Sequence, residues 1–428
     1  MTIPDQEWKS LKARGMDIVW LMGVWKRSPD GREKALNNPE LSSTYGHALP
    51  GWRPEDVTGS PYAVYDYRLE PALGEAEELV ALRKKLNRLG LQLMVDFVPN
   101  HLAMDHPWTV SYPDRFVGVD ASRVPEHPDW FFKNSQGVYL AHGRDPYFPP
   151  WGDTAQVNFF SREMREAMTD ELIRISEAVD GVRCDMAMLG LNRIFQQVWG
   201  NFVKDSAPQD EFWKSAITQV KKKRKSFLFL AEVYWNLEWE LQQMGFDYTY
   251  DKTLYDRLRH SDAAHALGHL KAEHDYQSRC ARFIENHDEE RAAQAFGKER
   301  SIAAASAAFT LPGLRFFHEG QAEGLKIKIP IQLIRAVEEN PDSQVANFYS
   351  HFLQIIDAPA FHEGLWQLWE SSAADVMAWS WSLGAQTQLV VLHFGEGDVQ
   401  GEVWVGGTDA KISIALKPWE CRFMEIDK

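Results

Sequence analysis

Residues 91–101 read LQLMVDFVPNH, an apolar run that carries Asp96 and ends just before Asn100 and His101. An apolar run of this length is typical of a strand buried on both faces, as parallel strands are. The polar residues then lie at the strand's carboxyl end. This stretch therefore predicts a parallel α/β sheet with functional side chains at one edge.

Three further segments have the same design, with polar residues at the end of a short apolar run. They are Gly181-Val-Arg183-Cys-Asp185, Leu230-Ala-Glu232 and Glu285-Asn286-His287-Asp288. The runs cover 179–182, 227–231 and 281–284, and helical stretches separate them. In a parallel α/β barrel the carboxyl ends of the strands meet at one mouth. Three acids, an arginine and two histidines would then share one pocket, which describes an active site.

The order and spacing of these four segments resemble the α-amylase superfamily, glycoside hydrolase family 13. The match covers all four of that family's signature regions. It extends to Gly59-Ser60-Pro61-Tyr62 before them and Phe317-His-Glu-Gly-Gln321 after them. One such segment would be weak, because a strand followed by Asn-His is common, but four in the correct order are specific. The resemblance implies a TIM-type (β/α) barrel with an inserted domain B and a C-terminal antiparallel β-domain.

Composition limits the other classes of protein. The chain has 428 residues, 44% hydrophobic and 25% charged, which is ordinary for a soluble globular enzyme. Its net charge of −15 disfavours nucleic acid or an anionic membrane surface as partner. No apolar run reaches the roughly 18 residues of a membrane span, and residues 1–15 lack the apolar stretch of a secretory signal, so we expect a cytoplasmic protein. Cys184, Cys280 and Cys421 are expected to be free thiols.

Hydrophobic periodicity gives the expected elements. We expect barrel strands at 18–24, 91–98, 180–187, 226–233, 246–250, 281–287 and 314–318. Helices are expected at 5–14, 75–89, 161–178 with Ser161 as N-cap, and 191–223. The Pro-, Gly- and polar-rich stretch 25–62 is expected to be a long loop.

Three parts of the chain differ in composition and hydrophobic periodicity. The barrel is expected over 1–101 and 158–358. Residues 102–157 are rich in Pro and aromatic residues without periodicity, too long for a plain connection, and match domain B in position. Residues 359–428 change to alternating strands, expected at 375–381, 388–393, 402–405, 411–416 and 422–426, which match a shortened C-terminal β-domain.

One barrel strand is missing from this count. In the family the first signature region ends the third strand, so 91–98 is strand three and 18–24 is strand two. Only a short helix precedes Ile18, which predicts a barrel lacking its first strand. Because an unpaired edge inside a barrel is costly, either the natural chain starts earlier or something fills the gap. Candidates are an irregular N-terminal segment, a rearranged loop, or an element of a second copy, which would make a homodimer.

The resemblance implies roles for three acids. Asp185 matches the nucleophile, Glu232 the acid/base, and Asp288 the third acid, which binds sugar hydroxyls and stabilises the transition state. Arg183 projects from the same strand face as Asp185 and would hold it ionised. Glu232 follows the apolar run 227–231, where a low dielectric would keep its proton available. A retaining mechanism would place the two carboxyls about 5–5.5 Å apart.

Further residues match binding and supporting positions. His101 and His287 match hydrogen-bonding partners of the sugar at the cleavage point, and Tyr62 matches an aromatic platform for that sugar. Tyr234 and Trp235 are expected to form walls for the leaving-group sugar. The expected structural support of the site comes from Asp96, Asn100 and Asn286, with Asp96 orienting Arg183.

The chain also departs from the family. Many α-amylases have a Lys-His pair after the nucleophile, which contributes to leaving-group binding and to calcium, whereas 186–189 here read MAML. Asn100 matches a common calcium ligand, but it would equally hold domain B by hydrogen bonds. Domain B offers scattered acids without ligand spacing: Asp114, Asp120, Asp145 and Asp153. No cofactor is expected to be required for the chemistry, and calcium stays an open alternative.

The leading expectation is a retaining α-glycosidase acting on α-1,4-linked maltooligosaccharides or starch-like glucan. A transglycosylase would use the same residues, and Trp151-Gly-Asp-Thr-Ala-Gln156-Val-Asn158 looks somewhat like a stretch in sucrose- and maltosyl-transferring members. An inactive scaffold or binding member is disfavoured because all three acids are kept. The sequence leaves linkage, substrate length and endo or exo action open.

Overall fold

The computed structural model describes residues 3–406 and 411–427. The chain divides into two compact units. Unit 1 comprises Met1–Thr249 with Ile329–Val337, and unit 2 comprises Tyr250–Lys328 with Glu338–Lys428. Each unit is described by itself below.

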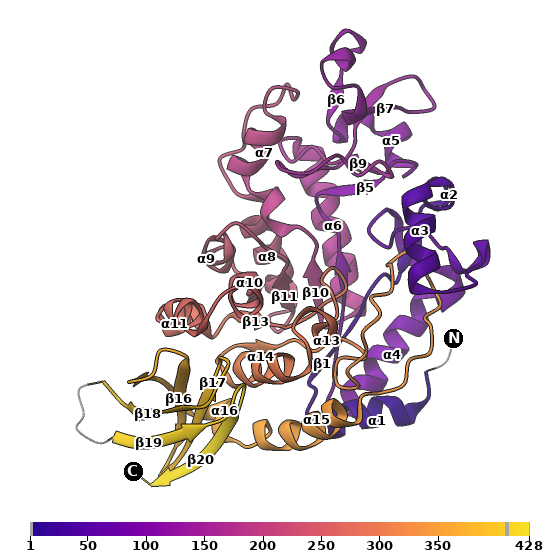
Figure 1. The fold of residues 1–428 in the computed structure, drawn as a ribbon. Coiled ribbons are helices and arrows are strands. Elements are labelled where there is room, and N and C mark those ends of the chain that lie inside the picture. The colour runs from indigo at the N-terminus through magenta and orange to yellow at the C-terminus, as the bar shows by residue number, and fades with distance from the viewer. Residues whose placement is uncertain (1–2, 407–410, 428) are drawn as a thin grey trace. The chain divides into compact units, whose positions relative to one another are not determined.

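Unit 1 contains a parallel sheet whose strands follow the predicted apolar runs. The strands pair in the order β1 (Ile18–Leu21), β4 (Gln92–Phe97), β10 (Gly181–Cys184), β11 (Leu228–Ala231) and β12 (Tyr248–Tyr250). Helices α4 (Ala76–Arg88), α6 (Arg162–Ala178) and α8 (Phe212–Lys223) come between them in the chain (Figure 1). The β4–β10 register sets Asp96 opposite Arg183, so both side chains belong to one edge of the sheet.

Unit 2 continues the strand series. Strands β13 (Cys280–Arg282) and β14 (Leu314–Arg315) pair in parallel, and the N–H of Asp251, directly after β12, donates to Ala281 O of β13. The strand order of the sheet is therefore β1-β4-β10-β11-β12-β13-β14. The buried, Ala-rich helix α14 (Lys298–Thr310) connects β13 to β14.

The prediction of seven barrel strands is confirmed, although each strand is shorter than its apolar run. The order starts at β1, and the only element before it in the described residues is helix α1 (Asp5–Ala13). The Ser161 N-cap is also confirmed, since its side chain accepts the Met164 N–H. The predicted helix over 191–223 is broken, because residues 200–211 separate α7 (Asn192–Trp199) from α8.

The predicted loop over 25–62 is wrong. It contains strand β2 (Trp25–Arg27), which pairs with β3 (Val64–Leu69), and helices α2 (Pro29–Asn37) and α3 (Pro39–Ala48). Each proline stands at the first helical position, where a missing N–H costs nothing. Ser28 and Asn38 cap the two helices by accepting backbone N–H groups. The residues that suggested a loop are helix-start signals.

Two groups of small antiparallel strands complete the chain. Within 101–156, β5 (His101–Ala103) pairs with β9 (Thr154–Gln156), and β8 (Tyr139–Ala141) lies between β6 (Gly118–Val119) and β7 (Phe131–Lys133). In unit 2 a six-stranded antiparallel sheet follows residue 364, in the order β19-β18-β15-β16-β17-β20 (Figure 1). Its bounds are β15 (Leu365–Ser371), β16 (Val376–Leu383), β17 (Gln386–His393), β18 (Val399–Trp404), β19 (Lys411–Leu416) and β20 (Cys421–Asp427). The sequence prediction missed β15.

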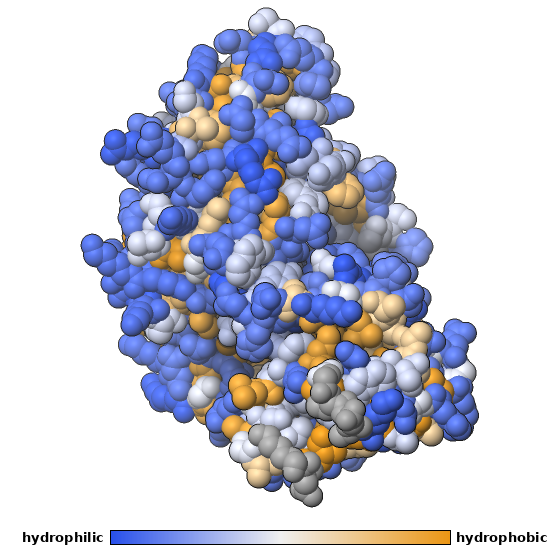
Figure 2. All heavy atoms as spheres, turned by 90° about the vertical axis from the view of Figure 1, so that its left-hand side faces the viewer, coloured by the Kyte–Doolittle hydropathy of each residue, from blue (hydrophilic) through white to orange (hydrophobic). Residues whose placement is uncertain are grey.

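The face of the molecule in Figure 2 is mainly polar. Most of the face in Figure 2 is hydrophilic, and apolar residues appear in smaller areas between polar ones. Within 3–406 and 411–427 no helix is both long and apolar enough to cross a membrane. The three cysteines are free, and two of them are buried.

Candidate active site

Arg183 stands at the centre of a buried charge cluster in unit 1. Its fully buried guanidinium contacts two carboxylates, with Nη1 2.8 Å from Asp185 Oδ1 and Nη2 2.9 Å from Glu232 Oε2. A third carboxylate, Asp96 Oδ1, lies 3.9 Å from Nη1. Charges buried this deeply are tolerated when they are paired and hydrogen-bonded. The carboxyl ends of β4, β10 and β11 thus bring three predicted residues around one arginine.

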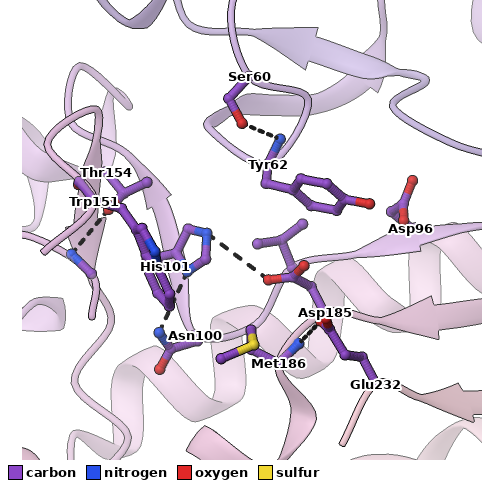
Figure 3. Close-up of polar contacts among 12 residues, drawn as sticks. Ser60, Tyr62, Asp96, Asn100, His101, Trp151, Thr154, Asp185, Met186 and Glu232 are labelled. Atoms are coloured by element: carbon purple, nitrogen blue, oxygen red, sulfur yellow. Dashed lines mark hydrogen bonds and ion pairs between the residues drawn. The ribbon is translucent and has the colours of Figure 1, made fainter. Parts of the chain in front are cut away.

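Asp185 faces a histidine as well as this arginine. His101 Nε2 lies 4.0 Å from Asp185 Oδ2, and Figure 3 shows the imidazole aimed at the carboxylate. Burial lowers the pKa of His101 to about 3, against a smaller opposite effect of a hydrogen bond with the Tyr62 backbone. The imidazole is therefore neutral at neutral pH. A neutral ring can exchange hydrogen bonds with an uncharged hydroxyl group.

Glu232 has a more polar setting than its apolar strand predicts. Besides the arginine, the Met186 N–H donates to Oε2 at 2.6 Å and the Tyr234 hydroxyl donates to Oε1 at 2.7 Å. The side chains of β11 before it are apolar and, from Phe229 on, buried, as expected, but the carboxyl group itself points among donors. Glu232 is 3% exposed, as a low-dielectric setting requires, and the sequence did not predict the donors that contact its carboxyl group.

The backbone after Asp185 is shaped to reach Glu232. Met186 has a φ of 41°, in the left-handed region that non-glycine residues rarely adopt. This turn aims two successive N–H groups at one residue, because the Met186 N–H donates to the Glu232 carboxylate and the Ala187 N–H to Glu232 O at 2.9 Å. The first of these contacts is drawn in Figure 3. Such backbone strain persists where the surroundings over-determine it and clusters at functional sites.

Asp96 and Tyr62 complete the walls around the arginine. Asp96 Oδ2 accepts the Gly23 N–H at 2.8 Å. Gly23 has a φ of 69°, and a Cβ there would stand 2.6 Å from a carbon of Pro61, so only glycine fits. The Tyr62 ring centroid lies 5.3 Å from Arg183 Cζ. The predicted aromatic platform thus lies beside the charge cluster (Figure 3).

Asn100 is tied to the 101–157 segment. Its Oδ1 and its backbone oxygen both accept from Gln156 Nε2, at 3.0 and 2.9 Å. Next to it the His101 and Trp151 rings lie 4.9 Å apart (Figure 3). These contacts match the alternative in which Asn100 holds domain B.

The sequence left calcium open, and the described residues do not show a site for it. The described part of the chain holds no group of three His, Cys, Asp or Glu side chains that could bind a metal ion. The amide oxygen of Asn100 is engaged by Gln156, and Asp145 Oδ1 accepts two backbone N–H groups. No chemical step is therefore assigned to a metal here.

Asn286, His287 and Asp288 belong to unit 2. Asn286 Oδ1 accepts the N–H of Asp288 and that of Glu289, each at 2.9 Å, which fixes the turn after β13. His287 Nε2 lies 3.0 Å from Asp288 Oδ2, and the Asp288 side chain is 44% exposed. The third predicted acid is thus accessible, on a loop that the expected support residue Asn286 orders.

Sequence reasoning gave no role to Glu285, although its motif was noticed. Its buried carboxylate accepts the Ala292 N–H at 2.6 Å and pairs with Arg291 Nη1 at 3.1 Å. It thereby closes the loop that carries Asp288. A buried acid directly before the Asn-His-Asp segment was the signal that could have identified it.

Tyr234 and Trp235, the residues predicted to form walls for the leaving-group sugar, differ in their contacts. The Tyr234 hydroxyl is engaged by Glu232, whereas the half-buried Trp235 packs edge-on against Tyr147, with ring centroids 5.1 Å apart. Tyr147 was not singled out from the sequence, because nothing in a Pro-rich segment marks which aromatic ring is exposed.

A parallel α/β sheet with buried carboxylates at the carboxyl ends of its strands is the arrangement of a barrel-type glycoside hydrolase. The profile of the family described as "Alpha amylase, catalytic domain" matches residues 7–352, and the chain belongs to this family.

Curated relatives carry names from the same family. "Alpha-amylase 3" of Dictyoglomus thermophilum is 25% identical over 315 residues, covering 68% of this chain and 59% of the relative. "Alpha-amylase MalA" of Haloarcula japonica is 27% identical over 322 residues, covering 73% and 40%. "Probable oligo-1,6-glucosidase 2" of Bacillus subtilis is 21% identical over 388 residues, covering 79% and 63%. The chain thus spans about half the length of the first two relatives.

Solved structures share the fold. The noncanonic maltogenic alpha-amylase AmyB from Thermotoga neapolitana is 20% identical, with a TM-score of 0.66 over 99% of this chain and 91% of its own. The cyclic alpha-maltosyl-(1→6)-maltose hydrolase from Arthrobacter globiformis is 19% identical, with a TM-score of 0.69 over 99% and 88%. At these identities the likeness establishes the fold alone.

Proposed function

We propose that the chain is a retaining α-glycosidase that hydrolyses α-glucosidic bonds, chiefly α-1,4, in maltooligosaccharides or starch-like glucans. The observation that carries this proposal is the single guanidinium of Arg183 holding Asp185 at 2.8 Å and Glu232 at 2.9 Å. Two carboxyls on adjacent nitrogens of one arginine are close neighbours, which favours the short spacing of a retaining pair over the wider one of an inverting pair.

The proposed mechanism has two steps. In the first, Asp185 attacks the anomeric carbon while Glu232 gives a proton to the leaving oxygen, so that the glycosidic bond breaks as the glycosyl–Asp185 bond forms. In the second, Glu232 takes a proton from water, which attacks the same carbon and releases Asp185. Configuration at the anomeric carbon is retained because it is inverted twice.

The other residues bind the sugar or support the acids. We assign His101, His287 and Asp288 to the hydroxyls of the sugar at the cleavage point, and Tyr62 to its ring face. Arg183 keeps Asp185 ionised, and Asp96, Asn100 and Asn286 hold the strand ends in place. Trp235 is assigned to the leaving-group side because it follows Glu232 by three residues. Relatives named alpha-amylases and oligo-1,6-glucosidase support a glucan substrate.

A product profile tests the substrate class. The enzyme should release glucose or short maltooligosaccharides from maltotriose and soluble starch, and the α-anomer should appear first by NMR. Maltose, sucrose and trehalose in the same panel define the linkage. A β-anomer as first product would contradict a retaining mechanism, and no turnover on any member would contradict the proposed function.

The second candidate is a transglycosylase using the same residues. The stretch 151–158 favours it, and in the structure Trp151 stands beside His101. Products longer than maltotriose, formed from maltotriose alone, would identify transfer to a sugar hydroxyl. An inactive binding member is the weakest reading, because Asp185, Glu232 and Asp288 are all present.

The domain limits and the oligomeric state are part of the same proposal. We propose a barrel over 1–101 and 158–358, domain B over 102–157 and a C-terminal β-domain over 359–428. Among the ways to cover β1, which include an irregular N-terminal segment and a rearranged loop, we propose testing a second copy of the chain, which would extend the sheet order and form a homodimer. Light scattering coupled to size exclusion tests this directly, since a monomeric mass would contradict it.

A further inference from the structure

Tyr67 makes an unusual pair of hydrogen bonds in the core of unit 1. Its hydroxyl donates to Val98 O at 2.8 Å and accepts the Val98 N–H at 2.9 Å. Both residues are buried. One side-chain hydroxyl therefore pairs both backbone polar groups of a single residue.

Val98 needs such a partner because the chain leaves the parallel sheet at this point. Strand β4 ends at Phe97, which is the last of its residues to pair with β10. The residue after Val98 is Pro99, which has no N–H to donate to a neighbouring strand. A buried N–H or C=O group without a partner costs free energy comparable to a lost hydrogen bond. The Tyr67 hydroxyl thus takes the place of a neighbouring strand.

Tyr67 is itself held firmly in β3. Its ring centroid lies 5.6 Å from that of Phe97 and 5.7 Å from that of Trp25, which packs edge-on against it. Burial raises the pKa of the Tyr67 hydroxyl well above its usual value of 10, and the hydrogen bond to Val98 has a smaller opposite effect. The hydroxyl therefore keeps its proton at neutral pH, so it can donate and accept at the same time.

The turn that Tyr67 holds contacts Asp185 on two sides. Phe97 O accepts the Asp185 N–H at 2.9 Å. His101, three residues after Val98, places its Nε2 4.0 Å from Asp185 Oδ2 (Figure 3). A shift of the backbone at Val98 would therefore move the imidazole relative to the carboxylate.

We infer that Tyr67 is a positioning residue, whose hydroxyl holds the turn 97–100 so that His101 meets a sugar hydroxyl beside Asp185. This inference rests on the proposed function, in which His101 binds a hydroxyl of the sugar at the cleavage point. Because Tyr67 is buried, it acts through the backbone rather than by contact with substrate. A displacement of about 1 Å in such a group is enough to lower the rate.

The test uses α-glucosyl fluoride and its 2-, 3-, 4- and 6-deoxy analogues, each of which lacks one hydroxyl group. In the His101→Ala variant, kcat/KM should fall for every substrate except the analogue that lacks the hydroxyl bound by His101. Tyr67→Phe keeps the ring and removes only its hydroxyl. Its kcat/KM should fall about three- to tenfold, the scale of one hydrogen bond, with the same exception. An equal loss on all five substrates, or no loss on any, would overturn the inference.

Two further variants separate positioning from general damage. In Tyr67→Phe/His101→Ala, kcat/KM should equal that of His101→Ala alone, because residues that act as one unit are not additive. Tyr45→Phe removes a fully buried hydroxyl of unit 1 that has no hydrogen-bond partner among the described residues. It should leave kcat/KM unchanged for all five substrates. Additive losses in the double variant, or the same selective loss in Tyr45→Phe, would count against the role of Tyr67.

A second variant covers the case in which Tyr67→Phe does not fold. Pro99→Ala loosens the same turn by freeing one backbone dihedral, and it removes no hydrogen bond because proline has no N–H. Its loss of kcat/KM should again spare the analogue that His101→Ala spares. A uniform loss would contradict a turn that acts through His101.

A binding measurement keeps the inference separate from the proposed function. Titration calorimetry of maltotriose into a Glu232→Gln variant needs no turnover. Adding Tyr67→Phe should weaken binding about threefold, and the same addition to Glu232→Gln/His101→Ala should leave the affinity unchanged. Equal affinities with and without the Tyr67 hydroxyl, when His101 is present, would overturn the inference. Absence of turnover by the unmodified enzyme on every substrate would overturn only the proposed function.

Discussion

The hydroxyl of Tyr234 donates a hydrogen bond of 2.7 Å to Oε1 of Glu232, two residues earlier in the chain. The other carboxyl oxygen, Oε2, is held by the Met186 N–H and by Arg183. Three donors therefore fix the orientation of the proposed acid. The Tyr234 hydroxyl can be removed by substitution while Arg183, which also binds Asp185, stays in place.

Replacing Tyr234 with Phe should lower kcat for maltooligosaccharides about two- to tenfold, because the hydroxyl orients Glu232 and one hydrogen bond contributes about 0.5–1.5 kcal/mol. KM should change little, since the ring stays. Steady-state kinetics on maltopentaose measure both. An unchanged kcat would contradict a role of the Tyr234 hydroxyl in positioning Glu232.

Replacing Glu232 with Gln should separate substrates by their leaving groups. For maltotriose, kcat/KM should fall by a factor of about 10² to 10⁴, the usual contribution of a general acid. For α-glucosyl fluoride it should fall far less, because fluoride leaves without a proton and kcat/KM reports the first step. Equal losses on both substrates would count against Glu232 as the acid.

The carboxyl ends of the strands could be predicted from the sequence because each is marked by a polar residue in or directly after an apolar run. Asp96, Arg183, Asp185 and Glu232 each follow or end a buried apolar run, and the parallel sheet then brings them together. The start of the strand order at β1 also followed from counting, since helix α1 is the only helix or strand before β1 in the described residues. Both features depend on patterns of residues that are close together in the sequence.

Contacts that depend on loops could not be predicted in the same way. Met186 and Trp235 have a left-handed backbone that is usually predicted only at glycine. This conformation sets the direction of the Met186 N–H and of the Trp235 ring. The helices α2 and α3 were missed because their caps, Ser28 and Asn38, look like loop residues when no long apolar face accompanies them. Tertiary context decides such positions.

Stability should fall as the pH is lowered, partly because of His106. Burial, together with the charge of Arg115, lowers its pKa to about 3 in the folded chain, against about 6.5 when unfolded. Between these values the unfolded state binds more protons, so stability rises with pH and is lost as pH falls below about 6.5. The loss from this residue should reach about 2 kcal/mol at pH 5.

The matched variant is His106→Asn, whose amide oxygen can replace Nδ1 as acceptor of the Trp108 N–H. Urea unfolding at pH 7 and pH 5 should show a smaller loss of stability in the variant than in the unmodified chain. The same loss in both would mean that His106 does not titrate as described.

Removal of divalent cations should leave the enzyme intact. Asn100 Oδ1 is occupied by Gln156 Nε2, so the position that resembles a calcium ligand is already satisfied. After dialysis against EDTA, the thermal midpoint and kcat should equal those measured with added calcium. A midpoint that rises with calcium concentration would contradict this account of Asn100.

The central claim is that Asp185 forms a covalent bond to the sugar, and trapping that bond tests it most directly. A 5-fluoro-α-glucosyl fluoride should form the glycosyl-enzyme quickly and release it slowly. Peptide mass spectrometry should then find one fluoroglucosyl unit on the peptide that contains Asp185, and none in the Asp185→Asn variant. A label on a different residue, or turnover of this substrate by Asp185→Asn at more than a few per cent of the unmodified rate, would contradict the account.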